Sequence, residues 1–65
     1  MIKQGDFVRI KEKYAFEENP LFHYGHCVEV DGGDIKLNWD RRYGHDSFIW
    51  VKANKYEKVN GDNNY

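Results

Sequence analysis

The chain lacks the covalent crosslinks that hold many small proteins together. It contains a single cysteine, Cys27, and therefore cannot form a disulfide within itself. A chain of 65 residues buries only about 60% of its unfolded surface when it folds, so its core is small. We expect one domain with a thin core, and the lone thiol favours a reducing, cytoplasmic setting.

The chain also lacks long apolar runs and a strong net charge. No stretch approaches the roughly 18 apolar residues of a membrane span, and the first six residues do not resemble the apolar centre of a signal peptide. We therefore expect a soluble protein. The net charge is −1 and the isoelectric point is about 6.3, well below the value of about 9 or more that is typical of nucleic-acid-binding domains.

Charge is nevertheless unevenly distributed along the chain. Residues 14–34 contain no lysine or arginine and five acidic side chains, whereas the segments on both sides are mainly basic. If these segments fold onto different faces, the molecule is a dipole that can orient a charged partner. The alternative is a set of ordinary solvated loops.

Aromatic residues are abundant, at 17% of the chain. A domain of this size cannot bury all of its phenylalanine, tyrosine and tryptophan side chains. Several should therefore lie at the surface, where aromatic clusters often mark binding sites. The alternative is that the tyrosines and tryptophans cover a thin core and keep their polar ends in water.

Alternation of apolar and polar residues predicts five short strands. Val8 and Ile10 face the core from the first strand. The Asp-Gly-Gly-Asp sequence at 31–34 predicts a tight hairpin turn. The continuous apolar run of the fourth strand leaves its buried pair undecided between Phe48 with Trp50 and Ile49 with Val51. The predicted strands cover residues 7–11, 26–30, 35–39, 47–51 and 56–59.

The segments between these strands are a long first loop and shorter turns. Residues 12–23 follow neither a strand nor a helix period, and Asn19-Pro20 marks a turn within them. A short helical turn is expected over 15–18, and another of 3₁₀ type over 52–55. We expect one domain over residues 1–59, followed by a frayed polar tail over residues 60–65.

Two segments resemble known families. Gly5-Asp6-Phe7-Val8-Arg9-Ile10, followed by a long loop and Tyr24 to Val30, resembles SH3-like barrels such as the KOW and Tudor modules and the small barrel subunit on the reducing side of photosystem I. Residues 8–20 and 51–56 are similar to true SH3 domains, although the adjacent tryptophan pair and the groove proline are missing. The abundance of Asn, Tyr and Lys in so short a chain resembles that of phage proteins.

The resemblance implies an all-β fold, a single closed five-stranded SH3-like barrel with a long first loop and a short 3₁₀ turn before the last strand. Barrels of this kind usually bind a partner and rarely catalyse a reaction. The resemblance therefore informs the fold more than the function.

The sequence does not favour a metal site or an active site. His23, His26, Cys27, His45 and Asp46 have metal-binding chemistry, but adjacent residues of a strand, such as His26 and Cys27, point to opposite faces. We expect Cys27 to be a small core residue and the histidines to be surface groups. A short chain also leaves little room for a walled pocket, so we expect no enzyme activity and no cofactor.

The favoured function is binding to a partner protein, as an adaptor, an accessory subunit or an inhibitor. Tyrosine, tryptophan and arginine dominate the energetically important positions of protein interfaces. Exposed aromatic side chains flanked by acidic ones would form such a surface on and near the 12–24 loop. The predicted protein-binding residues are Tyr14, Phe16, Glu17, Glu18, Phe22, Tyr24 and Trp50.

The alternative function is binding to single-stranded RNA or DNA. Small barrels bind single strands by combining a basic groove with aromatic rings on which bases stack. One contiguous basic stripe on the folded surface would favour nucleic acid, and scattered charges would favour protein. The residues predicted for this alternative are Lys36, Trp39, Arg41, Arg42 and Tyr43.

Overall fold

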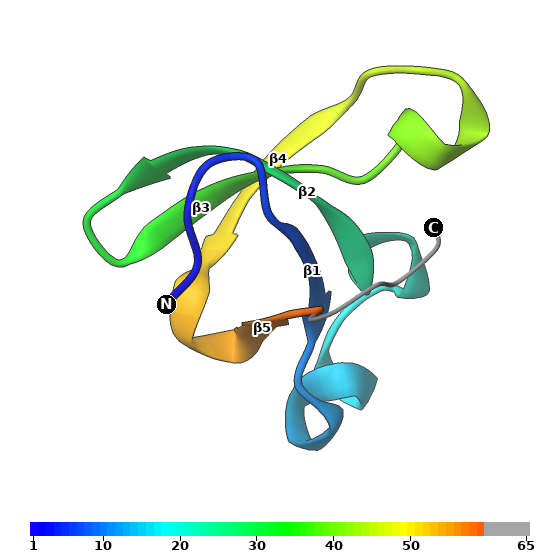
Figure 1. Ribbon diagram of the computed structural model, residues 1–65. Coiled ribbons are helices and arrows are strands. Elements are labelled where there is room, and N and C mark those ends of the chain that lie inside the picture. Colours follow the sequence, from blue (N-terminus) through cyan, green and yellow to red (C-terminus); the bar gives the residue numbers. More distant parts are fainter. Residues whose placement is uncertain (60–65) are drawn as a thin grey trace.

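A computed structural model of the protein describes residues 1–59 (Figure 1). The fold is all-β, as the sequence predicts. The tail expected over residues 60–65 lies outside the described residues. The elements in chain order are β1 (Phe7–Ile10), η1 (Glu12–Glu17), η2 (Pro20–Phe22), β2 (Tyr24–Asp31), β3 (Asp34–Asn38), η3 (Arg41–Tyr43), β4 (Phe48–Lys52), η4 (Ala53–Lys55) and β5 (Tyr56–Lys58), where η denotes a 3₁₀ helix.

The five strands form one antiparallel sheet in the order β4-β3-β2-β1-β5. Within the described part of the chain, β4 and β5 are the two edges and do not pair with each other, so the sheet is not closed. The prediction of five strands is confirmed, and the predicted closure into a barrel is not. The β1–β2 loop and the β3–β4 loop project from opposite ends of the molecule (Figure 1).

The core lies on one face of this sheet. Val8 and Ile10 are buried as predicted, and Cys27 is the expected small core residue, with 1% of its surface exposed. The other members of the buried cluster are Ile35, Leu37 and Tyr56. Burial of this apolar surface supplies the main favourable free energy of folding.

The inward-facing pair of β4, which the sequence leaves undecided, is Ile49 and Val51, and both are half-buried. Ile49 lies opposite Leu37 and Val51 opposite Ile35 in the register of β3 and β4, so both share the core face. Phe48 and Trp50 point the other way and remain 50% and 46% exposed. Two large aromatic side chains are therefore left on the outer face of an edge strand.

Gly25 lies where β2 crosses the core. A Cβ atom at this position would lie 2.7 Å from Cγ of Leu37 and 2.8 Å from the backbone oxygen of Asn38. The glycine is needed for this close approach, because either distance is shorter than a normal van der Waals contact.

Asn38 is buried although it lies on the face away from the core, with 3% of its surface exposed. Its Nδ2 donates to Oδ1 of Asp46 at 2.9 Å, and its Oδ1 accepts from the backbone N–H of Ser47 at 3.3 Å. Asn38 therefore ties the two ends of the β3–β4 loop together and is covered by that loop.

Candidate functional site

The loop between β1 and β2 is tied to the rest of the fold at several points. The hydroxyl of Tyr56 donates to the backbone oxygen of Phe22 at 2.6 Å, which links the end of the loop to β5. Nζ of Lys55 lies 3.7 Å from Oε1 of Glu17, which links η1 to η4. The loop, which we call the anchored loop (residues 11–23), therefore has a defined path over one end of the sheet.

His23 adds an internal link to the anchored loop. Its Nε2 lies 2.8 Å from the backbone oxygen of Ala15 and 3.2 Å from that of Glu18. Because a carbonyl oxygen only accepts hydrogen bonds, Nε2 carries the proton and donates. The expectation that the histidines are surface groups is wrong for His23, since it is half-buried and closes the loop on itself.

Local sequence explains the turns of the anchored loop. The side-chain oxygen of Asn19 accepts from the backbone N–H of Leu21 at 2.9 Å and caps η2, whose first residue is Pro20. This pairing is favourable because asparagine is a good N-cap and proline has no N–H to satisfy at the first helical position. The helical turn expected over 15–18 begins earlier, as η1 over Glu12–Glu17.

Phe16 lies on the outside of the anchored loop and is 86% exposed. Ala15 on one side is held by the hydrogen bond from His23, and Glu17 on the other makes a partly exposed ion pair with Lys55. The backbone that carries Phe16 is therefore held in place while its ring is left in water.

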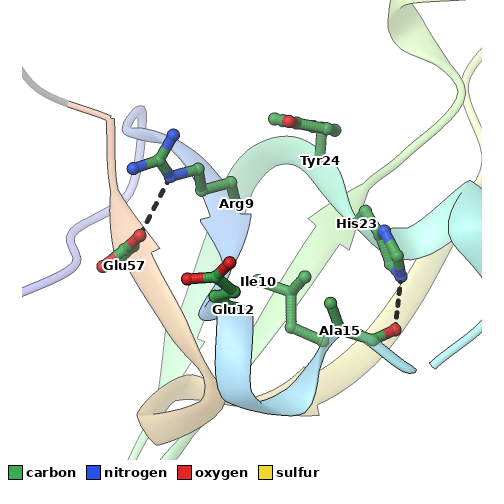
Figure 2. Close-up of a pocket in the computed structure, with 7 residues that line it drawn as sticks. All are labelled: Arg9, Ile10, Glu12, Ala15, His23, Tyr24 and Glu57. Atoms are coloured by element: carbon green, nitrogen blue, oxygen red, sulfur yellow. Dashed lines mark hydrogen bonds and ion pairs between the residues drawn. The ribbon is translucent and has the colours of Figure 1, made fainter. Parts of the chain in front are cut away.

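A groove of roughly 540 Å³ lies between the anchored loop and the strands β1, β2 and β5, and Ala15, the residue before Phe16, is part of its wall (Figure 2). Nε of Arg9 lies 2.9 Å from Oε2 of Glu57, its neighbour across β1 and β5, and Tyr24 lies on the other side of Arg9. Glu12 and Glu57 contribute two carboxylates against the single guanidinium of Arg9. The groove residues are Arg9, Ile10, Glu12, Ala15, His23, Tyr24 and Glu57.

The residues predicted to bind protein fall into three structural groups. Tyr14 and Phe22 pack against the core and support the loop from beneath. Phe16 is exposed on the outside of the anchored loop, whereas Tyr24 lines the groove of Figure 2 and stacks on Phe7 with ring centres 6.2 Å apart. The remaining predicted residues are Glu17, Glu18 and Trp50, which lie toward η4 and β4. Glu18 and Trp50 line a second groove of roughly 360 Å³. Glu17 forms the ion pair with Lys55 of η4.

The residues predicted to bind nucleic acid are divided between two places. Trp39 packs against the core, with its ring edge-on to Phe22 at 5.3 Å between centres, so it is not an open stacking platform. Lys36 lies on β3, with Nζ 5.0 Å from the ring centre of Phe48. The other three, Arg41, Arg42 and Tyr43, make up η3.

The basic side chains of the described residues are partly paired with acidic ones. Four of them, on β1, β4, η4 and β5, are each within ion-pair distance of a carboxylate. These four pairs are Arg9–Glu57, Lys52–Asp34, Lys55–Glu17 and Lys58–Asp6, at 2.9, 3.3, 3.7 and 3.7 Å.

Sequence reasoning missed an aromatic row on the outer face of the sheet. Phe7 lies opposite His26 across β1 and β2, and their rings meet edge-on at 4.9 Å. Burial, and after it the charge of Arg41, lowers the pKa of His26. Alternation along the strands places Phe7 and His26 on the same face as Phe48, and this is the signal that could have found them.

Metal ligands, the lone thiol and apolar helices are the remaining features of the described residues that bear on function. Residues 1–59 contain no group of three or more histidine, cysteine, aspartate or glutamate side chains arranged to hold a metal ion. Burial raises the pKa of the Cys27 thiol, which is the opposite of the change that activates a nucleophile. Among the described residues there is no helix with the length and apolar character needed to cross a membrane.

Comparison with known proteins adds no relative. No protein-family model, no curated protein and no solved structure matches the chain significantly.

Proposed function

We propose that the chain is an SH3-like barrel without enzyme activity that binds a partner protein through Phe16 and the groove that its neighbour Ala15 lines. The SH3-like assignment is supported by the strand order β4-β3-β2-β1-β5, the long β1–β2 loop and the 3₁₀ turn η4 before β5. A cytoplasmic location accords with the buried, unpaired thiol of Cys27.

The observation that carries this proposal is the exposure of Phe16 on an anchored backbone. Folding gains almost nothing from a ring that is 86% exposed, whereas burial of a phenylalanine in an interface contributes about 1.5–3 kcal/mol. Because the hydrogen bond from His23 already holds Ala15, little backbone entropy is lost when a partner covers the ring. Phe16 therefore has the character of a preorganised interface anchor.

The exposed groups on and near the anchored loop indicate what the partner surface contains. The partner offers an apolar pocket for the ring. It also offers a basic side chain for Glu12, since Glu57 already pairs with Arg9 and no ion pair to Glu12 is found among the described residues. This arrangement combines a central apolar contact with a charged rim that orients the complex.

The test is a pull-down from cell lysate, with and without nuclease, read by mass spectrometry. The wild type is compared with Phe16→Ala and with Tyr43→Ala, which removes an aromatic ring that is 54% exposed on η3. Circular dichroism checks that both variants keep the fold. The proposal predicts a protein that resists nuclease, is lost with Phe16→Ala and is kept with Tyr43→Ala.

The opposite pattern would establish the nucleic-acid alternative. In that case the captured material disappears with nuclease and with Tyr43→Ala, while Phe16→Ala has no effect. The pairing of four basic side chains with carboxylates argues against this result, because phosphate contacts by unpaired cations supply most of the affinity for nucleic acid.

A further inference from the structure

Strand β4 presents an open, apolar edge in the described part of the chain. It pairs with β3 on one side and with no described strand on the other. The second groove touches Ile49, Trp50 and Val51 together. Because Ile49 and Val51 face the core while Trp50 faces outward, a groove that touches all three runs along the edge of the strand, with Glu18, Lys55 and Tyr56 also in its lining. This edge is therefore accessible.

Two hydrogen bonds show which backbone groups of β4 point to the open edge. At one end of the β3–β4 pair, the backbone N–H of Trp39 donates to the backbone oxygen of Ser47 at 3.2 Å. At the other end, the backbone N–H of Ala53 donates to the backbone oxygen of Gly33 at 2.9 Å. In an antiparallel pair, bonding direction alternates from residue to residue. Residues 49 and 51 therefore bond to β3, and residues 48, 50 and 52 direct their N–H and C=O groups away from it.

Most edge strands carry a feature that discourages pairing, such as proline, a bulge or an inward-pointing charge. Strand β4 has neither a proline nor a register shift, and its only charge is Lys52 at its end. The run Phe-Ile-Trp-Val is the most apolar segment of the chain and lies entirely on this edge. Such a strand is a template for another strand.

We propose that a second copy of this chain pairs with β4, antiparallel and centred on Trp50. A two-fold axis at Trp50 places this residue opposite its own copy and Phe48 opposite Lys52 of the second copy. Every outward N–H and C=O of residues 48, 50 and 52 then meets the complementary group of the other copy.

The side chains match in the same register. On the outer face the two Trp50 rings are adjacent, and Phe48 meets a lysine, a pairing that Lys36 and Phe48 already make at 5.0 Å. On the core face Ile49 lies opposite Val51 of the second copy, so two β-branched apolar side chains meet. Lys52 gives up only an exposed ion pair with Asp34, which is worth little. The strand is thus complementary to itself, which selects a second copy over an unrelated strand.

The test is sedimentation equilibrium of the purified protein over a broad concentration range. The wild type should shift from 7.8 kDa toward twice that mass as concentration rises. Trp50→Lys and Trp50→Glu each place like charges opposite one another and should weaken self-association at least about tenfold. Phe16→Lys is the matched control, because it adds the same charge to another exposed aromatic position and should leave the dimer intact.

The register is tested by mixing the two Trp50 variants. Only if residue 50 lies opposite residue 50 does the introduced lysine meet the introduced glutamate, so an equal mixture should dimerise again although neither variant does alone. If either variant fails to fold, Phe48→Lys should dissociate the dimer by facing Lys52, and Phe48→Glu should retain it.

Three results would overturn the proposal: a wild type that stays monomeric at the highest concentration, a loss of dimer with Phe16→Lys, or a mixture of Trp50 variants that stays monomeric. The readout is the mass of the purified chain without a partner, so its outcome is independent of the proposed function.

Discussion

Replacement of Tyr56 by phenylalanine tests how the anchored loop is held. The Tyr56 side chain is 3% exposed, and its hydroxyl donates to the backbone oxygen of Phe22 at 2.6 Å. A hydrogen bond of this kind contributes about 1 kcal/mol net, and leaving a buried acceptor unpaired costs about 1–3 kcal/mol. Phe22 is only half-buried, so water partly replaces the lost donor. We therefore expect Tyr56→Phe to lower the free energy of unfolding by about 1–2 kcal/mol.

This loss is large for so small a domain, whose total stability is roughly 3–10 kcal/mol at typical values per residue. The midpoint of thermal unfolding should fall by about 5–15 °C, measured by circular dichroism. Tyr14→Phe is the control: it removes a hydroxyl from the same region, and no hydrogen bond from that hydroxyl is found among the described residues, so stability should stay within about 0.5 kcal/mol. Equal losses for the two variants, or no loss for Tyr56→Phe, would refute this account of the anchor.

Three further predictions concern the sheet. Gly25→Ala should lower the free energy of unfolding by roughly 1–3 kcal/mol in urea titrations, because the new Cβ would collide with the backbone of Asn38. A variant as stable as the wild type would contradict the close approach of β2 to β3 at this residue. Burial and Arg41 lower the pKa of His26 below 6.5 in the folded state, so the unfolded chain binds more protons and stability falls as pH drops below 6.5. His26→Gln should reduce this dependence between about pH 7 and pH 5, and an unchanged slope would show that other groups cause it. Cys27, buried with a raised pKa, should react with a maleimide at pH 8 at least about tenfold more slowly in the native protein than in urea, and equal rates would show that the thiol is accessible.

The strands could be predicted from the sequence because their signals are local. Alternation in β1 correctly placed Val8 and Ile10 in the core, and the glycines at 32 and 33 correctly placed the hairpin between β2 and β3. β2 starts at Tyr24, two residues before the predicted start, because Tyr24 pairs with Arg9 of β1. That pairing is tertiary and leaves no mark on the local pattern.

The candidate site could be predicted only in part. The sequence identified Phe16 as a surface aromatic, but nothing local distinguishes it from Tyr14 or Phe22, which pack against the core. The role of His23 depends on where the loop folds back, and it brings together residues five and eight positions apart. Such contacts are made by the tertiary path of the loop and have no periodic signature.

Folding brings oppositely charged segments of the chain together. The acidic middle segment and the basic segment after it meet in two ion pairs, Glu17 with Lys55 and Asp34 with Lys52. The basic–acidic–basic order therefore does not separate cleanly onto different faces. Part of it is neutralised locally by these two ion pairs.

The central claim is that the exposed ring of Phe16 binds a partner and contributes little to the stability of the fold. The most direct test is titration calorimetry of the protein captured in the pull-down against wild type and Phe16→Ala, alongside urea unfolding of both. We predict at least about tenfold weaker binding for Phe16→Ala, from the burial of a phenylalanine ring, with a free energy of unfolding within about 0.5 kcal/mol of wild type. Unchanged affinity in a folded Phe16→Ala protein would contradict the claim.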